Sequence, residues 1–143
     1  MTGIDLNGKQ TKDLMILSRE QGFPCELDDG LLAVYREQIR EGRIRMYGVY
    51  QEDQLVSIGT LSLFYVFPHR DSPTGLIGHI SGMFTHPGHR HKGYAGDVLG
   101  AMIADAREMR CEYVCVDSTA DRLYREKGFI PAPEDESRLW LPL

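Results

Sequence analysis

The stretch "HRHKGYAGDVLGAM", residues 89–102, begins as a basic loop with a glycine and continues as an amphipathic helix. Apolar residues recur along it at spacings of three and four, which predicts a helix with one face packed on a sheet. The first turn of a helix leaves backbone N–H groups unpaired and carries partial positive charge. Because Gly93 allows close backbone approach and Arg90 and Lys92 add positive charge, we expect this loop to bind a phosphate or pyrophosphate.

The segments on either side of this helix predict a strand–helix–strand unit. "LIGHISGMFT" (76–85) precedes the loop and "EYVCVDS" (112–118) follows the helix, and both are rich in residues that favour strands. Such a crossover joins parallel strands. Upstream, residues 43–50 and 55–67 read as an antiparallel hairpin with a turn between them. The sequence therefore predicts an α/β fold with a mixed sheet.

The remaining segments complete this fold. Residues 11–20 and 28–42 are amphipathic and predict two N-terminal helices. A short helix is expected over residues 120–127, and "RLWLPL" (138–143) is expected as a closing strand. A chain of 143 residues without a linker or repeat fits a single domain over residues 1–143.

Composition limits the classes of function. The net charge of −5 and the pI near 5.5 disfavour nucleic acid and anionic membranes as partners. The sequence contains neither an apolar run long enough to span a membrane nor a signal peptide, so we expect a cytoplasmic protein. Three cysteines without an export signal favour free thiols, and Cys111 and Cys115 are too far apart on a strand to form a disulfide.

The phosphate-binding loop matches neither of two common nucleotide motifs. The P-loop requires GxxxxGK[ST] and a dinucleotide-binding fold requires GxGxxG, and both are absent. Instead, Arg90-x-x-Gly93-x-Ala95 resembles the [RQ]xxGx[GA] signature of the GNAT superfamily of acyl-CoA-dependent N-acyltransferases. "MFTHPGHRHKGYAGDVL" (83–99) resembles the strand, loop and helix of that family as a whole. "TADRLYREKGF" (119–129) resembles its "AxxLYxxxGF" segment.

This resemblance implies a GNAT fold, with helices flanking a sheet whose central fourth and fifth strands splay apart to admit acetyl-CoA. It implies direct transfer of an acetyl group from acetyl-CoA, as co-substrate, to a primary amine of a small-molecule or peptide acceptor. The acceptor is expected beside the two N-terminal helices and the loop 68–75. Because fold does not fix function, a non-catalytic acyl-CoA-binding sensor or regulatory module is the alternative.

The resemblance also assigns the cofactor-binding residues. The backbone of residues 83–85 would pair with the pantetheine arm, and an amide near Met83 or Phe84 would polarise the thioester carbonyl. The loop amides would hold the pyrophosphate. Ser118 would contact pantetheine, although capping of a helix explains a serine there equally well. The implied cofactor-binding residues are Met83, Phe84, Thr85, Arg90, His91, Lys92, Gly93, Tyr94, Ala95, Gly96 and Ser118.

The catalytic residues are assigned with alternatives. Tyr124 matches the family tyrosine that protonates the departing thiolate, while simple packing beside Leu123 is the other interpretation. Transfer to an amine also requires a group that accepts the amine proton. Many relatives carry a glutamate on the fourth strand, but the segment 76–85 has none. His79 on this strand and Asp117 on the next are the two candidates for the general base.

Other chemistries are disfavoured by the sequence. His79, His86, His89 and His91 could suggest a metal site, but cysteines or carboxylates at matching ligand spacing are lacking, so we expect no metal. Cys115 could carry an acyl group, but a buried strand thiol is usually inert. An exposed edge beside "RLWLPL" could pair with a second copy, which makes a homodimer an expectation of the sequence.

Tyr94 and His91 depart from the family pattern. Tyr94 replaces a small aliphatic residue, and His91 stands where glycine is frequent. These departures bear on the detailed shape of the cofactor site.

Overall fold

One mixed sheet forms the centre of the chain. The computed structural model describes residues 1–20, 26–70, 72–117 and 122–143. Within these residues, seven strands lie in the order β1-β2-β3-β4-β5-β7-β6. The strands are β1 (Thr2–Ile4), β2 (Ile44–Gln51), β3 (Gln54–Tyr65), β4 (Leu76–Thr85), β5 (Tyr113–Val116), β6 (Ile130–Pro131) and β7 (Leu139–Pro142). The helices are α1 (Gly8–Glu20), α2 (Asp29–Arg40), α3 (Tyr94–Glu108), α4 (Arg122–Glu126) and the 3-10 turn η1 (Pro87–His89).

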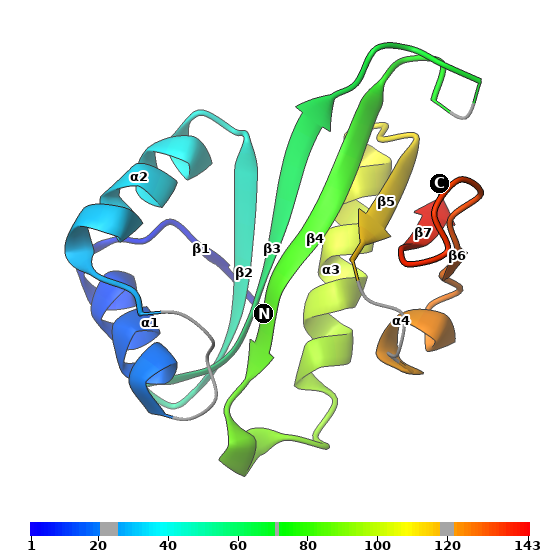
Figure 1. Ribbon diagram of the computed structural model, residues 1–143. Helices are drawn as coiled ribbons and strands as arrows, with labels where there is room; N and C mark the ends of the chain where they lie inside the picture. The colour runs from blue at the N-terminus through cyan, green and yellow to red at the C-terminus, as the bar shows by residue number, and fades with distance from the viewer. Residues whose placement is uncertain (21–25, 71, 118–121) are drawn as a thin grey trace.

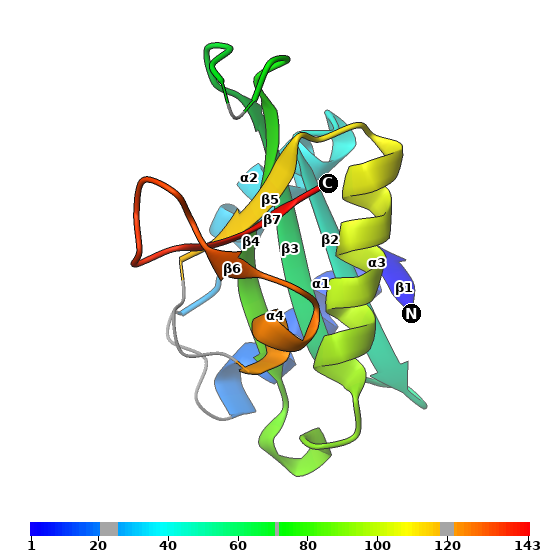
Figure 2. The ribbon, with the colours of Figure 1, turned by 90° about the vertical axis from the view of Figure 1, so that its right-hand side faces the viewer.

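Helices cover both faces of the sheet, as Figures 1 and 2 show. The apolar stripe of α3 packs on one face, and its buried members include Val98, Leu99 and Met102. On the other face, α1 and α2 pack over β1 to β3 through residues such as Leu17 and Leu32. The predicted mixed α/β fold with flanking helices is therefore confirmed.

The strands β4 and β5 separate along their length (Figure 1). They pair in parallel only where Gly78–Ile80 lies beside Val114–Val116. The strand β5 ends at Val116, whereas β4 continues to Thr85. The edge of β4 that faces away from β3 is consequently not paired with β5 over residues 81–85, as the expected splay of the fourth and fifth strands requires.

A β-bulge changes the direction of the side chains in this part of β4. Thr60 pairs with Ser81 and Ile58 with Phe84, so two residues of β4 lie opposite one residue of β3. Gly82 has a φ of 64°, a conformation that glycine adopts without strain. Within the bulge, Met83 packs against the core under α3, and beyond it the side chain of Phe84 packs against the core under α1 and α2.

Several element boundaries differ from the expectations. The strand β1 was not predicted, because three residues are too short to show a periodicity, yet it pairs with β2. The short helix begins at Arg122 and ends at Glu126, and residues 118–121 lie outside the described parts of the chain. The strand β6 pairs with Leu139 and Trp140 and covers that part of the outer edge of β7. None of the helices in the described residues is long and apolar enough to cross a membrane.

Candidate active site

A cleft opens where β4 leaves β5. It has a volume of about 670 Å³ and lies between the end of β4, the loop that leads into α3, and the helix α4. Its lining comprises Met83, Phe84, Thr85, His89, Arg90, His91, Gly93, Tyr94, Ala95, Gly96, Arg122, Leu123 and Glu126. The predicted cofactor-binding residues of β4 and of the loop therefore line one cleft, except for Lys92, which is exposed beside it. His79, the predicted base on β4, is not among the lining residues of this cleft.

The N-terminus of α3 forms one wall of this cleft. Gly93 is the N-cap and has a φ of 85°. It has no side chain to occupy the first-turn N–H groups, which carry the positive end of the helix dipole. His91, two residues earlier, also has a positive φ, of 63°. This backbone conformation favours glycine over residues with a side chain.

Arg90 lies over the end of β4. Its Nε donates a hydrogen bond of 3.1 Å to the Thr85 carbonyl, and its guanidinium carbon lies 6.0 Å from the centre of the Phe84 ring. The side chain is thus held at the end of β4, and it lines the same cleft as the N-terminus of α3. An anionic ligand is favoured at such a position by both charge sources.

Three side chains from neighbouring strands form a chain of contacts on the sheet face opposite α3. His79 on β4 lies 3.2 Å, from its Nε2, from Oδ2 of Asp117, the residue that follows β5. The Nε of Arg138, the residue before β7, donates a hydrogen bond of 2.8 Å to the other oxygen of this carboxylate. The structure therefore brings the two candidate bases into contact and adds an arginine that the sequence analysis missed.

The contacts of Asp117 account for its ionisation. The hydrogen bond from Arg138 lowers the pKa of the Asp117 carboxyl, partial burial opposes this change, and the hydrogen bond with His79 adds to it. The side chain of Asp117 is 61% exposed, so water also solvates the charge. At neutral pH Asp117 is consequently a carboxylate, which accepts hydrogen bonds from both neighbours.

The thiol of Cys115, beside His79, is in an environment that makes it unreactive. Cys115 pairs with His79 across the β4–β5 ladder and is fully buried. Burial raises the pKa of the Cys115 thiol, and its Sγ lies 3.6 Å from the Gly78 carbonyl oxygen. A neutral thiol that donates to a backbone carbonyl is a poor nucleophile, in line with the inert role expected for it.

Tyr124, the predicted acid, lies in the main core. Its side chain is 4% exposed, and its ring packs edge-to-face on Phe129 with 5.5 Å between the ring centres. Its neighbours Arg122 and Leu123 on α4 line the cleft. The structure thus places Tyr124 beside the cleft lining and does not bring it into the His79–Asp117 contact. Ser118, the remaining predicted residue, lies outside the described residues.

The loop histidines pack near one another. His86 accepts a hydrogen bond of 3.0 Å from the Gly88 N–H, and its ring meets that of His89 edge-on at 5.4 Å. The Nδ1 of His89 is buried without a hydrogen-bond partner among the described residues. In the same parts of the chain, no group of three histidine, cysteine, aspartate or glutamate side chains is close enough to hold a metal ion.

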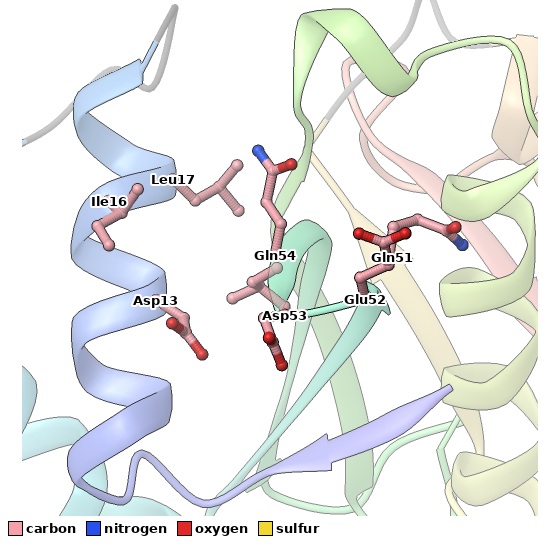
Figure 3. A pocket seen from close by; sticks show the side chains of 8 residues that line it. Asp13, Ile16, Leu17, Gln51, Glu52, Asp53 and Gln54 are labelled. Carbon is pink, nitrogen blue, oxygen red and sulfur yellow. The ribbon is translucent and has the colours of Figure 1, made fainter.

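A second hollow lies between α1 and the β2–β3 turn (Figure 3). It has a volume of about 390 Å³ and contains Asp13, Glu52 and Asp53. Asp13 already accepts hydrogen bonds from Lys9 and from the Tyr50 hydroxyl, at 2.9 and 2.7 Å. The hollow is therefore built partly from internal contacts and shares no lining residue with the cleft.

A cleft between two diverging strands, with a helix N-terminus at one wall, suits a long ligand that carries phosphate groups. Comparison with known proteins identifies the family of the chain. The model of the Acetyltransferase (GNAT) family matches residues 12–129. The chain belongs to this family, as its motifs predicted. No match was found among curated protein sequences.

Solved structures share this fold at low sequence identity. A predicted acetyltransferase from Clostridium acetobutylicum with acetyl-CoA is 20% identical, with a TM-score of 0.69, 94% of this chain covered and 84% of that chain. Glucosamine-6-phosphate N-acetyltransferase from Arabidopsis thaliana is 17% identical, with a TM-score of 0.71 and 88% of each chain covered. Ribosomal-protein-alanine N-acetyltransferase from Brucella melitensis is 14% identical, with a TM-score of 0.68 and 100% of each chain covered. The names of the last two describe a sugar phosphate and a protein, so the shared fold does not specify the acceptor.

Proposed function

We propose that this protein is an N-acetyltransferase that transfers the acetyl group of acetyl-CoA directly to a primary amine. The observation that carries the proposal is the cleft itself, which combines the unpaired edge of β4 with the N-terminus of α3. Membership of the GNAT family and the acetyl-CoA in the Clostridium structure support acetyl-CoA as the donor.

The residues of the cleft fit the two ends of this donor. The pyrophosphate would accept hydrogen bonds from the first-turn N–H groups of α3 and from Arg90. The pantetheine amides would pair with the backbone of β4 at Met83 to Thr85, where no strand of the described chain pairs on the β5 side. An N–H donor at this edge would stabilise the negative charge that develops on the thioester oxygen during attack.

Three proton transfers accompany the reaction, because the amine nitrogen loses two protons and the thiolate gains one. A protonated amine must lose a proton before its lone pair can attack, and we assign this proton to His79, with Asp117 hydrogen-bonded to its other ring nitrogen. The amine nitrogen then bonds to the acetyl carbon, and the bond from that carbon to sulfur breaks. The nitrogen loses its second proton in this step, and that proton replaces the one given to the departing thiolate. We assign the proton that neutralises the thiolate to Tyr124, whose hydroxyl would have to reach the cleft from its buried position.

Binding and turnover of the purified chain test the proposal. Calorimetric titration with acetyl-CoA, coenzyme A and ATP would show whether the cleft selects coenzyme A. A thiol-release assay over a panel that contains polyamines, aminoglycosides, amino sugars and peptides would then detect transfer. We expect acetyl-CoA to bind and thiol release to depend on one class of amine. Absence of binding to acetyl-CoA and to coenzyme A would overturn the assignment of the cleft.

The burial of Tyr124 favours a second function, a sensor or regulatory module that binds acyl-CoA without turnover. In such a protein the tyrosine would be a core residue and nothing more, since no thiolate would need a proton. Binding of acetyl-CoA with no thiol release from any amine of the panel would support this alternative. Thiol release above the uncatalysed rate with any amine would exclude it.

A further inference from the structure

We propose that Arg138 is a positioning residue that, through Asp117, fixes the orientation of His79 and offsets the charge of the carboxylate that His79 faces. The inference takes its functional meaning from the acetyl transfer proposed above, in which His79 accepts the amine proton. It concerns a residue that touches neither the cleft lining nor the expected donor, and its evidence is the geometry of three neighbouring strands.

The two oxygens of the Asp117 carboxylate have different partners. One oxygen faces His79 and the other accepts from Arg138, at 3.2 and 2.8 Å. A carboxylate that is held at one oxygen cannot rotate freely, so its second oxygen keeps one direction. With Nε2 of His79 facing that oxygen as an N–H donor, Nδ1 is left as the nitrogen that accepts a proton.

Arg138 is itself anchored by its backbone. Its N–H donates a hydrogen bond to the Asp135 carbonyl, at 3.1 Å, and its carbonyl accepts one from Ala132, at 2.9 Å. The residue after it begins β7, where Leu139 pairs with Val116 beside β5. The guanidinium therefore approaches Asp117 from a fixed point, and its side chain is 37% exposed.

The charges around His79 have opposing effects. The carboxylate of Asp117 stabilises the protonated, cationic imidazole, whereas the positive charge of Arg138 offsets that carboxylate. The neighbours of His79 in the ladders are Ser62 on β3 and the neutral thiol of Cys115 on β5. Asp135 in the β6–β7 loop interacts electrostatically with both Asp117 and Arg138, so Arg138 lies between two carboxylates.

The charges of Asp117 and Arg138 therefore act on the same imidazole with opposite sign. Without Arg138, the Asp117 carboxylate would hold His79 in its protonated form over a wider pH range, and less of the neutral imidazole would be available. Without Asp117, the imidazolium would lose its stabilising partner. The two changes therefore shift the titration of His79 in opposite directions, a pattern that a purely structural role of Arg138 does not produce.

The test is an NMR titration of the histidine rings in the full-length protein, with the His79 signal assigned by its loss in His79→Gln. We expect Arg138→Gln to raise the midpoint of that signal by about 0.5 pH unit and Asp117→Asn to lower it by about the same amount. Arg138→Lys keeps the charge and is expected to restore most of the parent midpoint. Arg107→Gln removes one positive charge from the exposed end of α3, on the opposite face of the sheet, and is expected to leave the midpoint unchanged.

An unchanged or lowered midpoint in folded Arg138→Gln would overturn the inference. If Arg138→Gln fails to fold, Arg138→Met replaces it, with the same expected rise in the His79 midpoint. A midpoint that rises in Asp117→Asn would also overturn the inference. The titration needs no acceptor, so it is independent of the proposed acetyl transfer. If the His79 midpoint shifts in opposite directions in the two variants but the parent releases no thiol, only the proposed acetyl transfer is contradicted. If the parent releases thiol but neither variant shifts the midpoint, only the role of Arg138 is contradicted.

Discussion

At the scale of single residues, the site depends on polar contacts whose partners are distant in sequence. Asp117 is mostly exposed, yet contacts with Arg138 and His79 hold it in one place. Tyr124 has the opposite environment, since its ring is enclosed by the main core although its neighbours on α4 face the cleft. The two side chains that we propose to act in the reaction, Asp117 and Tyr124, therefore differ widely in their exposure to solvent.

The lowered pKa of Asp117 predicts a small, pH-dependent contribution to stability. A carboxyl whose pKa is lowered on folding stabilises the fold above its ordinary value of 3.8 and loses this effect as the pH falls through its lower folded value. Because the group is largely solvated, we expect Asp117→Asn to reduce the free energy of unfolding at pH 7 by less than about 1 kcal/mol. The difference from the parent should shrink in urea unfolding at pH 3. A difference that stays the same at both pH values would contradict this assignment.

Removal of the Tyr124 hydroxyl separates catalysis from binding. If this phenol protonates the thiolate, Tyr124→Phe should reduce kcat for thiol release by about 100-fold or more, the usual contribution of a general acid. The dissociation constant for acetyl-CoA, measured by calorimetry, should remain within about twofold of the parent. Unchanged kcat in the variant would show that the proton comes from another donor and that Tyr124 is a packing residue.

At the scale of elements, α3 links the core to the cleft. Its apolar stripe packs on the sheet, and its first turn forms one wall of the cleft, so the packing of the helix also fixes the direction of its N–H groups. The strand β4 has a similar double role. It pairs with β5 near its start and passes beyond β5 at its end, which leaves its edge available to a ligand.

A pair of glycine substitutions tests the N-terminus of α3. Added Cβ atoms at Gly93 and at Gly96 would both meet nothing within 4 Å, but only Gly93, with a φ of 85°, has a backbone conformation that disfavours other residues. We expect Gly93→Ala to reduce the free energy of unfolding by about 1 kcal/mol. Gly96→Ala, inside the helix, should be neutral or stabilise by up to about 1 kcal/mol. Thermal and urea unfolding measure both, and equal losses would refute the backbone explanation.

At the scale of the whole molecule, two apolar clusters lie on opposite faces of one sheet. One is packed under α3 and the other under α1 and α2. The strands β2 and β3 contribute to both clusters, for example through Tyr47 and Met46 on adjacent positions of β2. Loss of either cluster would expose one face of the shared sheet, so we expect the two to unfold together.

Leu32 and Trp140 allow this cooperativity to be measured. Leu32, on α2, is 2% exposed, whereas Trp140, the single tryptophan, lies on β7, toward the edge of the sheet that is opposite β1. Leu32→Ala should cost about 2–5 kcal/mol. Tryptophan fluorescence and far-UV circular dichroism should report the same lowered urea midpoint in this variant. A fluorescence midpoint that stays at the parent value would show two independently unfolding parts.

The sequence by itself determined the features that depend on local patterns. The apolar spacing of α3, the glycine before it and the residues of the hairpin strands predicted these elements and the mixed sheet. These signals are readable because a helix or strand repeats its environment every few residues. Short elements such as β1 and β6 lack enough residues for a repeat, and they form only because a longer strand is there to pair with.

The tertiary structure alone decided which side chains meet. His79 and Asp117 are 38 residues apart, and Asp117 and Arg138 are 21 apart, so their contacts arise from strand order and register. The same packing buries the ring of Tyr124, which its sequence motif does not reveal. A local pattern encodes the direction of a side chain relative to its own element, whereas its partners depend on how the elements assemble.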